Sequence, residues 1–556
     1  MQRWRVPPAI ALLASLFAAR VSDGADATSN LDITNSFEAQ IAQLDARDPR
    51  APQALEAHLR YAAYLSNEPG EACSARLAAA RSQLQAAQKN AALGVVVPQG
   101  LARAAAVEYQ LHTALASCGD NTDALRRDQE LRAALESAQR AAALYEETFD
   151  YPAMITMQFN AAVTEHNLGD TAAAQSALRA VIDTDRKYGF RDDAEENYRL
   201  LLTWLPAAAT APIDPQQQAS PDRQVAALMQ DFPQRSTTLY FAWVPGNRTI
   251  TLISQSARLS GDKVVNATGS RTVMLDARKR FFGWLVTYQP LDSHYSLEPL
   301  SAGTGVESSF LTSLGTMLLH FHDFSLRSTK SETGGMSADF DETVDARRFK
   351  ERVEQEAHAY QQANLQLGDA APAGAGSAAI ARALDIRLKS LLWPVAVDAN
   401  SALDYNLETG AWPGATLEQG QWYGMKLMLP LPFAPNNFVL HQVQFAFSRE
   451  LPCSQDSDRT CVELVLRAVP DETDFMYAMR RLQHPMRLHQ GETLHASSTM
   501  YMRLITDPST LQAYHRDLRQ FFYVWVDGAA NDAALEPLLG SDRTAYDLSP
   551  VNPLTD

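Results

Sequence analysis

The chain has 556 residues, more than a single core of ordinary size accommodates, so its length predicts two or three domains. Hydrophobic residues make up 46% and charged residues 20%, a balance typical of globular proteins and unlike that of disordered chains. The formal net charge of −17 repels phosphate backbones and anionic lipid surfaces, so we expect no nucleic-acid partner.

Residues 1–24 have the pattern of a secretory signal peptide. Arg3 and Arg5 supply positive charge, an apolar run follows from Ala9 to Ala19, and small residues allow cleavage after Gly24 or Ala27. An uncleaved anchor or a buried helix is the alternative, but the run is shorter than the about 20 residues that span a bilayer. We therefore expect no transmembrane segment after cleavage, and a mature protein that is periplasmic or secreted, from a Gram-negative bacterium.

Residues 36–205 predict an all-α domain. They are rich in Ala, Leu, Gln, Glu and Arg, which favour helices, and their apolar residues recur at intervals of three and four. Short turn signals such as EPGE, SCGDN and NLGD separate the periodic stretches. The pattern indicates a series of helices joined by short turns.

One stretch of this domain has small residues and a glycine at the spacing of a helical hairpin. Ala162 and Ala174 would let two helices approach closely, and Leu178 would fill the space beside them. Gly169 would end the first helix in a left-handed turn. These four positions resemble a tetratricopeptide repeat, although the Trp, Tyr and Pro positions of that repeat hold other residues. The resemblance implies stacked hairpins that bind a protein or peptide segment along a concave face.

Three glycines indicate an internal period in the same domain. Gly70, Gly119 and Gly169 are 49 and 50 residues apart, and each lies at the turn of an expected helix pair. The period predicts about three hairpins and places Cys73 and Cys118 at the same edge of neighbouring layers, where a disulfide could join them. An irregular helical bundle is the alternative interpretation.

The composition changes after the helical domain. Residues 206–222 are rich in Pro, Ala and Gln without periodicity and read as a linker. Beyond them we expect a strand-rich α+β lobe over residues 223–366, a flexible joint over 367–378, and a second α+β lobe over 379–556. The predicted fold class is therefore a helical-repeat N-terminal domain followed by an α+β, mainly antiparallel C-terminal part.

Period-two alternation marks the expected strands of this C-terminal part. Residues 236–244 and 248–254 flank a VPGN turn and predict a hairpin. Helical periodicity predicts two helices, over residues 341–368 and 377–393. The other expected strands cover residues 316–326, 422–429, 438–447, 462–469 and 499–505.

Cys453 and Cys461 lie at the ends of a polar loop between two of these strands. Because the strands would form a hairpin, the two cysteines would face each other and close the loop with a disulfide. Metal binding is the alternative, but their spacing does not resemble a zinc site. An even number of cysteines in an exported chain also favours disulfides.

The segment WPGATLEQGQWY is the densest cluster of aromatic residues and glycine. Trp412, Trp422 and Tyr423 could form the rim of a pocket for an apolar or sugar ligand, or they could fill the core of a sheet. The order strand, helix, strand is similar to that of half-barrel lipoprotein carriers in the periplasm. That similarity implies a carrier or sensor of a hydrophobic or sugar ligand.

His320 and His322 are the best candidates for a metal site. Two residues apart in a strand, their imidazoles point to the same face and could reach one ion. They share that face with apolar residues, so buried core histidines are the alternative. We find no nucleophile motif, phosphate-binding loop or dinucleotide fingerprint, and we therefore expect no catalytic residue and no cofactor.

The sequence thus favours a non-enzymatic binding or scaffold protein of the cell envelope, whose helical repeats hold a protein or peptide partner. A ligand carrier built on the C-terminal sheet is the first alternative. A metal-dependent enzyme at His320 and His322 is the second.

Overall fold

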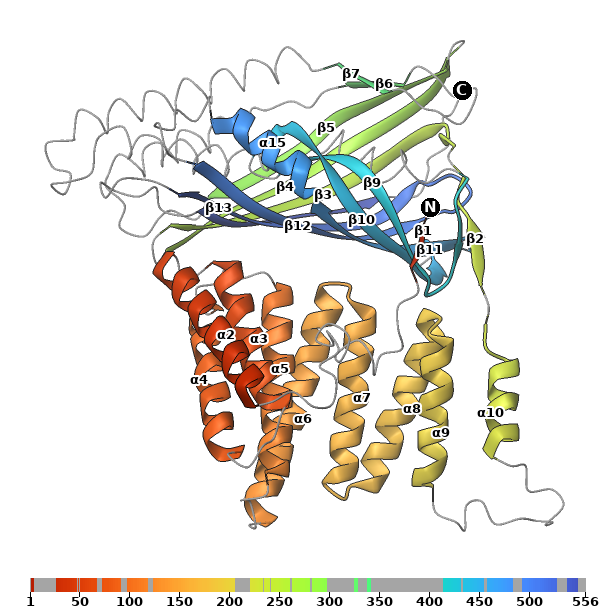
Figure 1. Cartoon of the computed structure of the whole chain (residues 1–556). Coiled ribbons are helices and arrows are strands. Elements are labelled where there is room, and N and C mark those ends of the chain that lie inside the picture. Colours follow the sequence, from red (N-terminus) through yellow and green to blue (C-terminus); the bar gives the residue numbers. More distant parts are fainter. Residues whose placement is uncertain are drawn as a thin grey trace, which may run out of the picture. The chain divides into compact units, whose positions relative to one another are not determined.

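The chain divides into two compact units, each of which is described by itself (Figure 1). The helical unit comprises residues 4–235 with Glu418–Gln421, and the sheet unit comprises Met1–Arg3, Ser236–Leu417 and Trp422–Asp556. This computed structural model describes residues 2–4, 27–47, 49, 51–67, 73–91, 98–118, 124–205, 221–233, 235–240, 242–260, 263–280, 283–297, 325–328, 338–341, 414–431, 434–454, 458–483, 493–527 and 538–548.

Consecutive helices build the helical unit, as the sequence predicts. Neighbours in sequence pack against each other, and α3, α5 and α7 each form a hairpin with the helix that follows. Gly70 and Gly119 lie outside the described residues, in the sequence between the helices of the first two hairpins; Gly169 lies in the third turn. The helices are α2 (Ala27–Arg47), α3 (Pro52–Asn67), α4 (Cys73–Ala91), α5 (Pro98–Ser117), α6 (Ala124–Glu147), α7 (Tyr151–Asn167), α8 (Thr171–Tyr188), α9 (Arg191–Trp204) and α10 (Pro221–Gln230).

The ends of α7 and α8 follow from local side-chain chemistry. The carboxylates of Asp150 and Asp170 accept hydrogen bonds from the backbone N–H groups of Ala153 and Ala173, at 3.3 and 3.0 Å, and so begin the two helices. Gly169 separates the helices with φ +85°, a left-handed conformation that glycine adopts without steric cost. A single glycine and a single aspartate therefore define this hairpin turn.

The helical unit extends further than the sequence predicts. We expected it to end at residue 205 and the strand-rich part to begin at residue 223, but α10 belongs to the helical unit. Val225, Met229 and Phe232 pack with Ala194 of α9 in a small apolar cluster. The boundary was misplaced because α10 is short and follows a Pro- and Gln-rich stretch that hides its apolar face.

Within its described residues, the sheet unit contains a large sheet of 12 strands and a small sheet of two strands. The order of the large sheet is β1-β9-β10-β11-β12-β13-β14-β3-β4-β5-β6-β7, and β2 pairs with β8. The strands are β1 (Gln2–Trp4), β2 (Ser236–Thr238), β3 (Gly246–Ser260), β4 (Lys263–Arg280), β5 (Gly283–Leu297), β6 (Ser325–Ser328), β7 (Ala338–Asp341), β8 (Thr416–Glu418), β9 (Trp422–Leu431), β10 (Ala434–Pro452), β11 (Thr460–Pro470), β12 (Thr493–Thr506), β13 (Ala513–Asp527) and β14 (Leu538–Leu548).

This single sheet corrects the prediction of two separate lobes. The C-terminal strand β14 pairs antiparallel with β3, from Leu548 opposite Ile250 to Leu539 opposite Leu259, and so joins both halves. Pairing between strands so distant in sequence is not encoded in local alternation, which explains why the sequence suggested two lobes. Cleavage after Gly24 would remove β1 and leave β9 at the edge of the sheet.

Four of the expected strands correspond to β9, β10, β11 and β12, but the hairpin predicted over residues 236–254 is wrong. Leu239 donates its backbone N–H to Ala415 O at 2.9 Å, and Tyr240 donates to Pro508 O at 2.7 Å. The segment after β2 therefore pairs with distant chain, while β3 pairs with β4 and β14. Local alternation identified the strands but not their partners.

The large sheet carries an apolar core that includes Phe445, Leu464, Met502 and Leu518. The helix α15 (Glu472–Gln483) packs against β10 and β12 (Figure 1). This helix was not predicted from the sequence. The two helices predicted at residues 341–368 and 377–393 lie outside the described residues.

Candidate functional site

The predicted packing positions of the third hairpin are buried together. Ala162 of α7 and Ala174 and Leu178 of α8 are each 0% exposed. No atom lies within 4 Å of a Cβ built on Gly169, so the positive φ, and not crowding, is what requires glycine there. The small and large packing residues of this hairpin are thus fully buried, and α7 packs against α8.

Replacing Gly169 with alanine is expected to lower the free energy of unfolding by about 1 kcal/mol, because a left-handed residue with a Cβ is strained by that amount. Thermal or urea denaturation followed by circular dichroism measures the loss. Ala172→Gly is the comparison, since Ala172 is exposed in the first turn of α8 and glycine should cost no more there. An unchanged midpoint for the Gly169 variant would contradict the left-handed turn.

In each of the three hairpins, the first helix is largely buried and the second helix is more exposed. The side chains exposed on α3, α5 and α7 are few and, except for Arg60, lie at helix ends. By contrast, α4, α6 and α8 each present a continuous exposed stripe. On α6 the stripe includes Arg132, Glu136 and Gln139, and on α8 it includes Ser176 and Arg179. The second helix of each of these three hairpins is therefore the more exposed of the pair.

Polar side chains connect one hairpin to the next. Arg103 of α5 pairs with Glu56 of α3 at 2.5 Å. Glu130 of α6 accepts from His112 of α5 at 2.6 Å and pairs with Arg81 of α4 at 3.7 Å. The Arg103–Glu56 and Arg81–Glu130 pairs bridge the first and second hairpins, whereas the His112–Glu130 contact lies within the second hairpin. Because most of these side chains are partly exposed, each contributes little stability, on the order of 0.2–1 kcal/mol.

One buried carboxyl group links α8 to α9. Asp185 is 0% exposed, and its Oδ2 accepts a hydrogen bond from Asn197 Nδ2 at 2.8 Å. Burial raises the pKa of Asp185 to about 8, the hydrogen bond from Asn197 opposes this rise, and the charge of Asp193 adds to it. The carboxyl group is therefore protonated in the folded protein at neutral pH.

This raised pKa predicts a pH dependence of stability. Between pH 3.8, the ordinary pKa of an aspartate, and about pH 8, its pKa in the folded protein, the folded state holds a proton that the unfolded state releases, so stability falls as pH rises. The slope is at most about 1.4 kcal/mol per pH unit. Asp185→Asn keeps an acceptor for Asn197 and is expected to abolish the slope and raise the melting temperature at pH 8 to 9. Asp183→Asn, at an exposed position of α8, is the control; equal slopes in all three proteins would refute this assignment.

Two disulfides join the four cysteines. Cys73, at the start of α4, is bonded to Cys118, directly after α5, with Cα atoms 6.0 Å apart. Cys453 and Cys461 are bonded at the loop between β10 and β11, with Cα atoms 4.8 Å apart. Both pairings are those the sequence suggests. Disulfides of this kind are typical of proteins that fold in oxidising compartments.

The predicted ligand residues do not form one surface. Tyr423 is buried in the apolar core, where its ring stacks on Phe445 at 5.7 Å. Trp422 precedes it in β9 and so points to the opposite face of the sheet. Trp412 lies outside the described residues, as do His320 and His322. Among the residues with described positions, no group of three His, Cys, Asp or Glu side chains could hold a metal ion.

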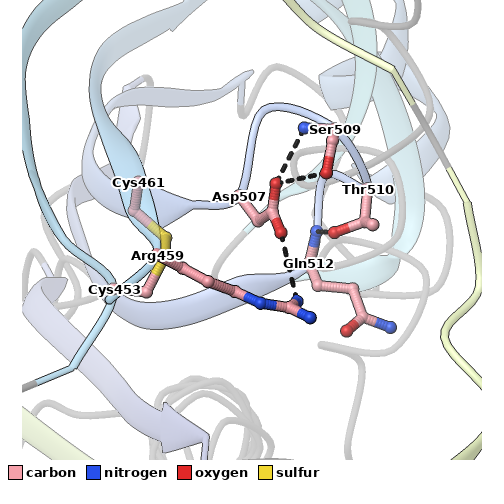
Figure 2. Close-up of a disulfide and its surroundings, with 7 residues drawn as sticks. All are labelled: Cys453, Arg459, Cys461, Asp507, Ser509, Thr510 and Gln512. Atoms are coloured by element: carbon pink, nitrogen blue, oxygen red, sulfur yellow. Dashed lines mark hydrogen bonds and ion pairs between the residues drawn. A yellow bond between two sulfur atoms is a disulfide. The ribbon is translucent and has the colours of Figure 1, made fainter. Parts of the chain in front are cut away.

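A polar turn that contains Asp507 and Ser509 lies next to the Cys453–Cys461 disulfide (Figure 2). It was not predicted from the sequence. Asp507 Oδ1 accepts hydrogen bonds from the backbone N and the hydroxyl of Ser509, at 2.8 and 2.6 Å. Its Oδ2 forms an ion pair with Arg459 Nη1 at 3.7 Å, and Arg459 lies in the loop that the disulfide closes. Leu511 ends the turn with a positive φ of 51°. The turn is thus held by its own side chains.

A buried arginine lies close to this turn. Arg248 of β3 is 1% exposed and is paired in register with Leu275 of β4. Burial lowers the pKa of Arg248, and so does the charge of Arg459, whereas Tyr514 and Asp507 favour the charged form. One feature of the sequence points to Arg248: it is a charged residue on the same strand face as the apolar Ile250. It was not among the predicted site residues.

Comparisons with known proteins do not assign the chain to a family. No protein-family model matches it, and no curated protein does. Among solved structures, one on lipid-protein interactions in lipovitellin matches with 9% sequence identity and a TM-score of 0.25. The match covers 57% of this chain and 26% of that chain, and at this TM-score it carries no argument about fold or function. Within the described residues, no helix is both long enough and apolar enough to cross a membrane.

Proposed function

We propose that the protein is an exported, non-enzymatic binding or scaffold protein of the Gram-negative cell envelope, whose helical unit engages a protein or peptide segment. One observation carries this proposal: the second helix of each hairpin presents an exposed stripe, while the first helix is largely buried. Stacked hairpins with one repeated exposed face are suited to binding extended segments, because each layer adds a similar contact. The tetratricopeptide resemblance of the third hairpin supports the same proposal.

The chemistry of the stripes indicates the kind of partner. On α4 the exposed residues include Ala75, Ala78 and Ser82, whose small side chains let a partner backbone approach closely. On α6 and α8, Arg132 and Arg179 add positive charge beside acidic and amide groups. Such a mixed surface favours a polar peptide segment held by hydrogen bonds and scattered ion pairs over a purely apolar helix.

The proposed compartment rests on the signal-peptide pattern and the cysteines. All four cysteines are in disulfides. Disulfides persist in the periplasm and outside the cell, where thiols are not kept reduced. An exported chain is consistent with both features, and it places the helical unit where envelope proteins are its available partners.

The proposal is tested by isolating a tagged mature protein from an exporting host after mild cross-linking. The test variant replaces Arg132, Gln139 and Arg179 with alanine. The control replaces Arg467, Lys279 and Gln444, exposed side chains of the sheet unit, and also removes two positive charges and one amide. We expect the test variant to lose the partner that the wild type and the control retain. Loss in the control alone would place the binding surface on the sheet unit.

No second function is proposed. The carrier interpretation predicts a cavity lined by Trp412, Trp422 and their neighbours, and of these neighbours Tyr423 has its ring in the core of the sheet. Both histidines of the metal interpretation lie outside the described residues, as does Trp412.

A further inference from the structure

The guanidinium of Arg248 is a buried charge without an acceptor among the described residues. Its Nε, Nη1 and Nη2 atoms form no hydrogen bond there, and the side chain is 1% exposed. Tyr514 and Asp507 favour its charge, and Tyr514 does so in part as a loosely placed hydrogen-bond partner, but none of the three guanidinium nitrogens has an acceptor at full hydrogen-bond distance and angle. Burying a cation without such partners is strongly unfavourable, so this arrangement favours an anionic acceptor.

The carboxylate of Asp507, which lies near Arg248, already has hydrogen-bond and ion-pair partners. Asp507 Oδ1 accepts two hydrogen bonds from Ser509, and Oδ2 pairs with Arg459 (Figure 2). These contacts hold the Asp507 carboxylate in place. Two arginines and one aspartate leave the cluster with a net positive charge, and that charge attracts an anion.

The surroundings of Arg248 strengthen such binding. Its strand neighbour Ile250 and its cross-strand partner Leu275 are apolar and buried, so the local dielectric constant is low and charge interactions are strong. Tyr514 packs against the Cys453–Cys461 disulfide cluster, which fixes the other side. The site is built from β3, the loop between β10 and β11, and the turn between β12 and β13.

We infer that Arg248, with Arg459 beside it, binds one small oxyanion, a carboxylate or phosphate group, at this end of the sheet. A guanidinium offers two parallel N–H groups that match the two oxygens of such an anion. The near-complete burial of Arg248 restricts the bound part to one anionic group, either a free ion or the end of a larger molecule. This site belongs to the sheet unit and does not depend on the proposed function of the helices.

The inference is tested by thermal denaturation and calorimetric titration of the mature, disulfide-intact protein. Inorganic phosphate, acetate and glycerol 3-phosphate are compared with chloride at equal ionic strength. We expect at least one of them to raise the melting temperature saturably. Binding of phosphate but not of its glycerol ester would identify a free ion, and binding of both would identify a phosphate ester. Binding of acetate alone would identify a carboxylate.

Three variants and a matched control identify the residues. Arg248→Met should weaken binding at least tenfold, whereas Arg467→Met, at an exposed position of β11, should bind like the wild type. Arg459→Gln should weaken binding about threefold, and Asp507→Asn should strengthen it by a similar factor, as expected for partly screened charges. If Arg248→Met does not fold, the opposite changes in anion affinity of Arg459→Gln and Asp507→Asn test the inference instead. Equal melting temperatures in all anions, which an enclosed water would also give, would overturn the inference.

Discussion

Replacing Cys73 and Cys118 with serine is expected to lower the free energy of unfolding of the helical unit by about 4 kcal/mol. The bond closes a loop with a sequence separation of 45, and the chain-entropy model predicts a cost of this size when such a loop is released in the unfolded state. Urea denaturation followed by helical circular dichroism measures the loss. Because α4 and α5 also pack through buried apolar residues, we expect the helices to remain formed in the absence of denaturant.

The second disulfide supplies the matched comparison. Cys453 and Cys461 are separated by only 8 residues, so their replacement with serine is expected to cost about 2.5 kcal/mol by the same model. Tryptophan fluorescence follows the sheet unit in this case. A larger loss for the second pair than for the first would show that loop entropy does not govern the contribution of these bonds.

Leu178→Ala is the second change with a large expected effect. Leu178 is 0% exposed in the α7–α8 hairpin beside Ala162 and Ala174, so truncation removes buried methyl groups and leaves a cavity. We expect a loss of about 2–5 kcal/mol in the free energy of unfolding, as for other fully buried leucines. The denaturation midpoint in urea measures it.

Leu125→Ala is the control for this substitution. Leu125 is 68% exposed in α6, so the same chemical change should alter stability by less than about 0.5 kcal/mol. Similar losses at the two positions would contradict the packing of the third hairpin.

The helical half could be predicted because its signals are local. Gly169 and the small residues around it specify a turn and a close contact within about 30 residues of chain, and short hairpins place sequence neighbours side by side. The end of the unit was missed because α10 contacts α9 across a stretch without periodicity. A contact of that kind depends on tertiary packing and not on local propensity.

The sheet half could be predicted only in part, for the converse reason. Alternation identified β9 to β12, where consecutive strands form hairpins, but it could not reveal that β14 pairs with β3. The backbone hydrogen bond between Leu239 and Ala415 also joins residues that are far apart in the sequence. It forms in place of the hairpin that the VPGN turn predicts. Strand register is set by the partner strand, which the sequence does not name.

The candidate sites also differ in whether local sequence could predict them. Both disulfides could be inferred from spacing and turn signals, since each pair lies near a hairpin turn. The cluster of Arg248 with Arg459 and Asp507 could not, because its members come from three distant parts of the chain. A charged residue on an otherwise apolar strand face was the one available signal, and it becomes informative only once its neighbours are known.

The most direct test of the account is photo-cross-linking of the mature protein in an exporting host. A photoreactive amino acid is placed at Ser82, Gln139 and Ser176, on the exposed stripes of α4, α6 and α8, and at Gln444 and Thr251, on exposed positions of the sheet. If the helical unit binds a protein partner, the three helical positions give a common protein adduct and the two sheet positions give none. Adducts from the sheet positions alone, or from none of the five, would contradict the proposal that the helical unit binds a protein partner.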